Sequence, residues 1–173
     1  MPAEALRERI REIPDFPKPG ILFYDITTLL KDPAAYKEAI DLMLEPYQGE
    51  PIDIVVGMES RGFIFSAPMA YQLDAGLVPV RKLGKLPAET ITVEYALEYG
   101  SNTLEIHRDA ITPGQRVLIV DDLLATGGTV QGTIELVERL KGEVVGLAFL
   151  VELDFLKGRD RLDGRRVTSV IKY

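Results

Sequence analysis

The chain has 173 residues, about the length of one domain, and is long enough to bury a core without disulfides or a structural metal. It contains no cysteine, which excludes disulfides, thiolate chemistry and metal sites built on cysteine. Its 27 acidic residues outnumber the 20 basic ones, and the resulting net charge of −7 disfavours nucleic-acid binding, which needs a basic face.

We expect a single domain over residues 1–173, with an N-terminal hood over about 1–33 and a core over about 34–173. No apolar stretch reaches the length of a transmembrane helix, and the N-terminal segment lacks the apolar region of a secretion signal. The sequence therefore predicts no membrane contact and a cytoplasmic location.

A helical pattern opens the chain and gives way to a segment that cannot be helical. Two apolar residues four positions apart among charged ones predict a helix over residues 3–12. Three prolines and a glycine follow and forbid a helix, so residues 13–26 should form an extended hood. Asp32 can then cap a helix over residues 33–48, with a proline in its first turn.

Apolar runs and helical patterns alternate through the rest of the chain, which is typical of a mostly parallel, doubly wound α/β sheet flanked by helices. The predicted strands span residues 52–58, 77–82, 116–120, 143–151 and 167–171, and the predicted helices span residues 61–73 and 127–141. Two further alternating segments, 90–99 and 103–107, are separated by Gly100, Ser101 and Asn102 and predict an antiparallel flap. A flap of this kind covers a ligand.

Residues 117–129, VLIVDDLLATGGT, combine a buried strand, two adjacent carboxylates and a turn of small residues. Ligands of parallel sheets bind at the C-terminal ends of the strands. Asp121 and Asp122 can accept hydrogen bonds from the 2- and 3-hydroxyls of a ribose. Five residues then let backbone N–H groups approach a phosphate: Ala125, Thr126, Gly127, Gly128 and Thr129. The motif predicts a ribose 5-phosphate site.

Two further phosphate-binding motifs match the chain poorly. A P-loop needs Ser or Thr after Gly-Lys, but Gly84-Lys85 is followed by Leu86, and the Gly-x-Gly-x-x-Gly of dinucleotide-binding folds does not occur. An isolated Asp-Asp or Gly-Gly pair would more often be an ordinary strand end and helix cap. The ordered run of strand, acidic pair and turn is far more specific than either pair alone.

The motif resembles that of the type I phosphoribosyltransferases, which use 5-phosphoribosyl 1-diphosphate (PRPP). Segments 16–33, 59–63, 81–87, 97–111 and 150–162 extend the similarity over nearly the whole chain and resemble the members that act on adenine. The resemblance implies the type I phosphoribosyltransferase fold and phosphoribosyl transfer from PRPP to adenine, which gives AMP and pyrophosphate in purine salvage. Transfer to another purine base and a PRPP- or nucleotide-sensing regulator on the same fold are the alternatives.

Two cationic groups are candidates for binding pyrophosphate. Arg61 lies in the turn ESRG at a predicted strand end, where its guanidinium and backbone N–H groups can hold phosphate oxygens. Arg81, Lys82 and Lys85 form the second group. The resemblance implies that Mg²⁺ arrives bound to PRPP and not in a protein metal site, and that Arg81 reaches the pyrophosphate of a second subunit in a homodimer. It also implies a non-proline cis peptide, here before Ser60.

The hood and the flap supply the remaining candidates. Leu22, Phe23 and Tyr24 combine backbone hydrogen bonding with aromatic faces and are the predicted adenine contacts. In the family a flap glutamate is the catalytic carboxylate, which implies Glu98, with Tyr99 beside it, as the catalytic pair. A closed flap would desolvate Glu98 and raise its pKa, so that it can exchange a proton with a purine ring nitrogen. His107, the only histidine, is expected to be structural or peripheral.

Overall fold

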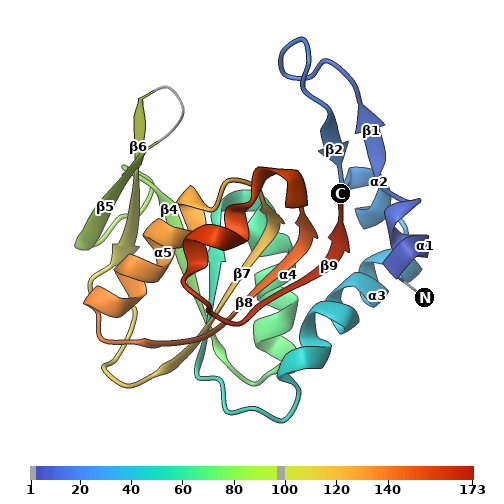
Figure 1. Cartoon of the computed structure of the whole chain (residues 1–173). Helices are drawn as coiled ribbons and strands as arrows, with labels where there is room; N and C mark the ends of the chain where they lie inside the picture. Colours follow the sequence, from blue (N-terminus) through green and yellow to red (C-terminus); the bar gives the residue numbers. More distant parts are fainter. Residues whose placement is uncertain (1–2, 97–99) are drawn as a thin grey trace.

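The computed structural model describes residues 3–96 and 100–173. Within them, one seven-stranded sheet is covered by helices on both faces (Figure 1). In spatial order the strands are β5 (Thr90–Ala96), β6 (Ser101–His107), β4 (Gly76–Lys82), β3 (Ile54–Met58), β7 (Arg116–Leu124), β8 (Glu143–Glu152) and β9 (Val167–Lys172). The strands from β4 to β9 in this order pair in parallel, and β6 pairs antiparallel with β4 and β5. The predicted mostly parallel α/β sheet is confirmed.

The helices connect the strands and cover the sheet. They are α1 (Ala3–Arg7), α2 (Thr27–Leu30), α3 (Pro33–Leu44), α4 (Glu59–Gln72) and α5 (Gly128–Arg139), with 3-10 turns η1 (Glu45–Tyr47), η2 (Asp154–Leu156) and η3 (Gly158–Leu162). Asp32 caps α3 as predicted, because its Oδ1 accepts hydrogen bonds from the N–H groups of Ala34 and Ala35 at 3.0 and 3.2 Å. Over residues 3–96 and 100–173, every helix is too short or too polar to cross a bilayer.

The side chains of β7 explain why helices cover both faces of the sheet. Successive side chains of a strand point to opposite faces. Leu118 and Val120 pack into a core with α3 and α4, whereas Val117 and Ile119 pack into a second core with α5. All four side chains are fully buried. An uninterrupted apolar run is therefore what a strand between two helix layers requires.

The chain order of the central strands creates a crevice at one edge of the sheet. β3 lies between β4 and β7. The helix that follows β3, α4, and the helix that follows β7, α5, pack into different cores on opposite faces of the sheet (Figure 1). The chain therefore leaves the C-terminal ends of two neighbouring strands in opposite directions, and such a divergence is where α/β sheets bind ligands.

The hood is a two-stranded hairpin and not only an extended arm. β1 (Arg11–Ile13) pairs antiparallel with β2 (Phe23–Asp25), and the hairpin rises beside the sheet edge (Figure 1). The helix expected over residues 3–12 is wrong in its second half, because α1 ends at Arg7. Pairing with β2 supplies hydrogen bonds that a helix would otherwise make, so tertiary contacts override the local helical pattern.

Asp25 anchors the hood where β2 ends. Its carboxylate accepts hydrogen bonds from Thr27 N at 2.9 Å, Thr27 Oγ1 at 2.7 Å and Arg11 Nε at 3.0 Å. The Thr27 hydroxyl and then Arg11 lower the pKa of Asp25 from 3.8 to about 2. Because the pKa of Asp25 is lower in the folded than in the unfolded protein, the ionised carboxylate stabilises the fold at pH values above 3.8. This stability is lost as the pH falls through about 2.

Replacing Asp25 by asparagine is therefore expected to lower the melting temperature at neutral pH by about 2–4 °C. The difference should narrow as the pH falls from the usual carboxyl value of 3.8 toward about 2, because the native Asp25 then also loses its charge. Thermal unfolding of both proteins across this pH range measures the effect. A difference that stays constant with pH would show that the charge of Asp25 contributes nothing.

The predicted flap is an extension of the main sheet. β5 and β6 pair antiparallel over their whole lengths, and β6 joins β4 through the pairs of Arg81 with Glu105 and Lys82 with Leu104. Helix α5 lies close behind the flap: a Cβ atom on Gly128 would lie 3.4 Å from the Tyr95 ring, and one on Gly132 would lie 3.3 Å from Val93. The flap strands are therefore fixed to both the sheet and α5.

Candidate active site

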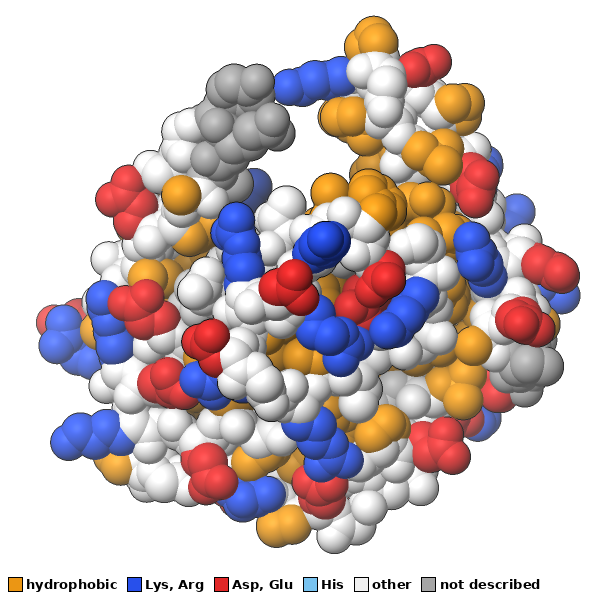
Figure 2. All heavy atoms as spheres, in the orientation of Figure 1, with side chains coloured by type: hydrophobic (Ala, Val, Ile, Leu, Met, Phe, Trp, Pro, Cys, Tyr) orange, Lys and Arg blue, Asp and Glu red, His pale blue; other side chains and the backbone are white. Residues whose placement is uncertain are grey.

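Three adjoining hollows open at the C-terminal edge of the sheet. The space-filling view shows the surface hollowed beside the hood (Figure 2). The largest, about 380 Å³, lies between β3, β7 and the flap; the second, about 220 Å³, follows the turn after β7; the third, about 160 Å³, lies beneath the hood. Arg61 and Asp122 line all three, and Arg61 Nε lies 3.2 Å from Asp122 Oδ2. This ion pair marks the point where the hollows meet.

The acidic pair lies inside β7, which runs four residues beyond the expected end at residue 120. Asp121 and Leu124 still pair with β8, opposite Phe149 and Glu152, so the strand continues through the acidic pair. Asp122 is buried and lines all three hollows, whereas Asp121 lines only the two larger ones. The predicted pair therefore reaches the site from a strand and not from a loop.

The Asp121 carboxyl has an unusual electrostatic environment. Burial and the neighbouring Asp122 carboxylate raise the pKa of Asp121 well above its usual value. The Asp122 N–H donates to Asp121 Oδ1 at 2.8 Å and offsets part of this effect. Gly62 brings α4 against the same oxygen, since a Cβ atom there would lie 3.0 Å from Asp121 Oδ1. The site therefore holds a carboxyl group that resists ionisation.

The turn after β7 has the geometry of an anion site. Residues Ala125 to Gly127 connect β7 to α5, and Gly127 has a φ of 88°, a left-handed conformation that suits glycine. No side chain caps the N-terminus of α5 within the described residues, and the residues that carry its first N–H groups line the second hollow. All five predicted turn residues line this hollow. The arrangement suits a phosphate.

The turn ESRG forms the first turn of α4 and not a separate loop. The prediction of a cis peptide before Ser60 is wrong, because the single cis bond among the described residues joins Phe16 and Pro17. The local strain lies instead at Glu59, which has a φ of 53°, a conformation that a residue with a side chain rarely adopts. This backbone conformation starts α4 directly at the end of β3 and brings Ser60 and Arg61 to the largest hollow.

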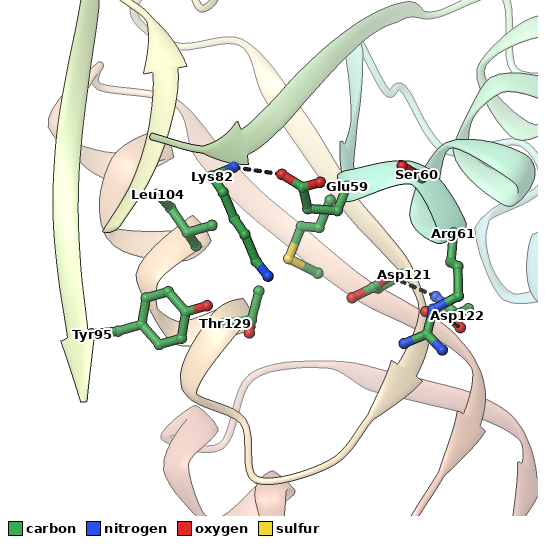
Figure 3. Close-up of a pocket in the computed structure, with 10 residues that line it drawn as sticks. Glu59, Ser60, Arg61, Lys82, Tyr95, Leu104, Asp121, Asp122 and Thr129 are labelled. Carbon is green, nitrogen blue, oxygen red and sulfur yellow. Dashed lines mark hydrogen bonds and ion pairs between the residues drawn. The ribbon is translucent and has the colours of Figure 1, made fainter. Parts of the chain in front are cut away.

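Glu59 gathers the second cationic group. Its Oε2 lies 3.4 Å from Arg81 Nη2 and 3.3 Å from Lys85 Nζ, and its Oε1 accepts a hydrogen bond from the Lys82 N–H. Burial raises the pKa of Glu59, but these three donors outweigh it and leave the pKa below its usual value. Among the three predicted cations, all of them described residues, only Lys82 lines the largest hollow, into which its side chain points (Figure 3).

Glu105 supports the loop that carries Lys85, a role that the sequence did not predict. It is 3 % exposed, and its carboxylate accepts hydrogen bonds from the N–H groups of Lys85 and Leu86 at 2.9 and 2.8 Å. These bonds hold the loop that carries Lys85 against the flap. The sequence offered no signal for this role, because Glu105 occupies an ordinary position in an alternating strand.

The third hollow is apolar and suits a flat ring. Leu22, Phe23 and Tyr24, the three predicted adenine contacts, line it together with residues that the sequence did not single out: Ile21, Ile26, Leu123, Val151 and Leu153. The Tyr24 ring lies 3.9 Å from the ring of Tyr173, a contact that no sequence pattern predicted. Arg61 Cζ lies 5.9 Å from the Phe23 ring, so the hollow adjoins the guanidinium.

The predicted catalytic pair, Glu98 and Tyr99, lies outside the described residues, so its role stays a prediction. The described flank of the flap contributes Tyr95 and Leu104 to the wall of the largest hollow (Figure 3). His107 lies at the other end of β6, where its Nε2 accepts a hydrogen bond from the Ala88 N–H at 3.4 Å, and this contact supports the structural role expected for it.

Known proteins similar to this chain share its length and fold. A family model described as phosphoribosyl transferase domain matches residues 25–171. The adenine phosphoribosyltransferase of Acidobacterium capsulatum is 61 % identical over 170 residues, which cover 98 % of this chain and 94 % of that protein. The crystal structure of the Rhodothermus marinus adenine phosphoribosyltransferase is 55 % identical with a TM-score of 0.95, and covers 99 % of this chain and 98 % of that one.

A third relative was crystallised with ligands. The adenine phosphoribosyltransferase of Saccharomyces cerevisiae, complexed with adenine and an imino-altritol bisphosphate, is 42 % identical with a TM-score of 0.91, and 97 % of each chain is covered. The acidic pair, the glycine turn and the apolar hollow thus occur in a chain whose sequence and fold both match one group of enzymes. The chain belongs to the adenine phosphoribosyltransferases of the phosphoribosyl transferase domain family.

Proposed function

We propose that this chain transfers the 5-phosphoribosyl group of PRPP to adenine and releases AMP and pyrophosphate, a reaction of purine salvage. The observation that carries the proposal is the meeting of three chemically different hollows at Arg61 and Asp122. One is apolar, one surrounds a glycine turn and one contains cationic side chains. PRPP and adenine together need these three environments around a single ribose.

The ribose 5-phosphate half of PRPP occupies the turn after β7. The free N–H groups at the start of α5 donate to the 5-phosphate, and the helix dipole favours its negative charge. Asp121 and Asp122 accept hydrogen bonds from the ribose hydroxyls. These residues hold the sugar and take no part in proton transfer.

Pyrophosphate leaves into the largest hollow, where Arg61 and Lys82 neutralise its charge. Mg²⁺ enters as part of the substrate, bound to the phosphates of PRPP. Arg81 and Lys85 contact Glu59 of their own chain in this structure. In the proposed homodimer, Arg81 reaches the pyrophosphate bound by the second subunit. We place the enzyme in the cytoplasm, with a single domain in each subunit. Sedimentation velocity measures whether two subunits form this dimer.

Adenine stacks in the apolar hollow against Phe23, with Leu22 and Tyr24 at its rim. In the reaction the bond from C1 of the ribose to the pyrophosphate oxygen breaks, and a bond from C1 to the purine nitrogen forms. The transition state carries positive charge on the ribose, so the site must exclude water. The hood and flap, which border the hollows, serve this purpose.

Glu98 accepts the proton that the purine nitrogen loses, and Tyr99 adjoins it in the chain. Replacing Glu98 by glutamine is expected to lower turnover by about 100-fold, because the amide cannot take a proton. PRPP binding should persist, since the phosphate and ribose contacts lie elsewhere. Steady-state and binding measurements on the variant separate the two effects; unchanged turnover would remove Glu98 from the mechanism.

A base panel tests the proposed function directly. PRPP consumption is measured with adenine, hypoxanthine, guanine and xanthine as the second substrate. We expect turnover with adenine and little with the others. Preference for a 6-oxopurine would mean that the chain is a phosphoribosyltransferase for another purine base. PRPP binding without turnover of any base would mean that it is a PRPP-sensing regulator.

A further inference from the structure

We propose that the segment from Asp154 to Leu162 is a brace that positions the phosphate turn, with Gly158 as its contact point and Arg159 as its anchor. This segment follows β8 and contains η2 and η3. Among the described residues that line the three hollows, none belongs to it, so the brace acts through the turn and not on the substrate. The inference rests on the proposed function, because it concerns affinity for the 5-phosphate.

The contact between brace and turn is unusually close. A Cβ atom on Gly158 would lie 2.2 Å from the carbonyl oxygen of Ala125 and 3.1 Å from Gly127 N. A Cβ atom on Gly127 would in turn lie 2.7 Å from the carbonyl oxygen of Gly158. The two backbones therefore pack directly against each other at the position where the turn presents its N–H groups. Even the smallest side chain at Gly158 must displace the turn or the brace.

The brace cannot easily yield, because it is fixed at both ends. Its first residue, Asp154, donates a backbone hydrogen bond at 2.9 Å to the carbonyl oxygen of Tyr173, and the preceding Leu153 N donates at 2.9 Å to that of Leu124, the residue before the turn. Leu162 is 1 % exposed and packs into the same core as α5. The brace is therefore tied to the strand that precedes the turn and to the layer that contains the helix after it.

Arg159 locks the middle of the brace. Its Nε and Nη2 lie 2.9 and 2.6 Å from the two carboxylate oxygens of Glu152, which is 2 % exposed at the end of β8. Its Nη1 donates to the carbonyl oxygen of Val167 at 2.9 Å. A fork of this kind fixes orientation as well as distance. Since Glu152 pairs with Leu124 across the sheet, the ion pair places Gly158 relative to the strand that carries the turn.

AMP and adenosine provide a direct test, because they differ only in the 5-phosphate. The ratio of their dissociation constants, measured by calorimetry, reports what the phosphate turn contributes. In Gly158→Ala we expect this ratio to fall by about 100-fold, because a displacement of about 1 Å is enough to misalign the phosphate donors. The affinity for adenosine should stay unchanged, since no brace residue lines the apolar hollow.

Gly142→Ala is the matched control. It creates contacts of 2.8 Å with Val137 and 2.9 Å with Ile111, so it perturbs packing away from the site, and the ratio should persist. A Gly158→Ala protein that keeps the ratio, or that loses AMP and adenosine affinity equally, overturns the proposal. If the protein before substitution binds AMP no more tightly than adenosine, the proposed function fails and not the brace.

Arg159→Met tests the anchor without adding bulk and serves if Gly158→Ala does not fold. We expect the ratio to fall by about tenfold, because the brace loses its fixed position but not its contact with the turn. Arg166→Met is the control: Arg166 also pairs with a carboxylate, Glu50 at 2.5 Å, and also donates to a backbone carbonyl, that of Pro46. An equal loss in both variants would contradict a specific role for Arg159.

Discussion

Replacing Arg61 by methionine is expected to lower kcat/KM for PRPP by about 1,000-fold, the cost of losing a positioned donor for developing negative charge. The guanidinium borders all three hollows, and its side chain is 50 % exposed, so N–H groups that do not face Asp122 remain available to phosphate oxygens. Methionine keeps much of the side-chain volume and removes the charge. The change therefore isolates the electrostatic contribution of Arg61.

A second effect accompanies the first. Asp122 is 5 % exposed, and without Arg61 its carboxylate loses its paired cation. A buried charge without its partner is costly, so the ribose contacts should weaken together with the pyrophosphate contacts. Steady-state kinetics with PRPP and a separate titration with AMP measure both losses.

Arg116→Met is the control for Arg61→Met. Arg116 pairs with Glu143 at 3.3 Å. These residues begin β7 and β8, so the pair lies at the N-terminal ends of the two strands, whereas the site lies at the C-terminal ends. The variant should keep its kcat/KM while losing an arginine–carboxylate ion pair of similar length. Arg61→Lys refines the test, because a lysine restores the charge but not the two-pronged geometry, and only partial recovery is expected. Full activity in Arg61→Met would refute the assigned role.

Local patterns predicted the part of the fold that local residues determine. The apolar run of β7 needs helices on both faces, and Gly127 with a φ of 88° ends the strand and begins α5 in the way its lack of a side chain permits. The hood shows the limit of such patterns. Residues 8–12 carry a helical pattern, yet β1 forms from residue 11 because Asp25, far along the chain, pairs with Arg11. A short window of sequence contains no trace of that partner.

The same distinction applies to the site. Asp121, Asp122 and the turn are consecutive, so their proximity was predictable, whereas Glu59 meets Arg81 and Lys85 only through the pairing of β3 with β4. The cationic group was therefore expected to face the ligand as a unit, but two of its members are held by Glu59. Contacts between Tyr24 and Tyr173 depend on β9 closing the sheet edge beside the hood, which no spacing within either segment indicates.

Replacing Asp121 by asparagine is expected to weaken AMP and PRPP binding by about 100-fold, because the ribose hydroxyls lose a charged acceptor. The same change should stabilise the empty protein at neutral pH. Burial and then the Asp122 carboxylate raise the pKa of Asp121 well above its usual value, so ionising it in the native state is unfavourable. Asparagine has the same shape and no charge, and it removes this cost.

The sign of the pH dependence follows from proton binding. Between its usual value of 3.8 and its raised native value, Asp121 binds protons more tightly in the folded than in the unfolded state. The stability of the native protein is therefore full below the usual value and is lost as the pH rises through the raised one. Asp121→Asn should melt at nearly the same temperature as the native protein in acid and at a higher one at neutral pH, by about 2–4 °C for each 1 kcal/mol of repulsion removed.

Thermal unfolding from acid to neutral pH, combined with AMP titration at neutral pH, separates the two effects of Asp121→Asn. Asp109→Asn is the control, because Asp109 is exposed and lines none of the three hollows, so neither quantity should change. A variant that binds AMP weakly without gaining stability would mean that Asp121 is ionised at little cost. A variant that gains stability but binds AMP normally would mean that Asp122 alone holds the ribose. The predicted combination requires that substrate hydroxyls stabilise a carboxylate which the empty fold disfavours.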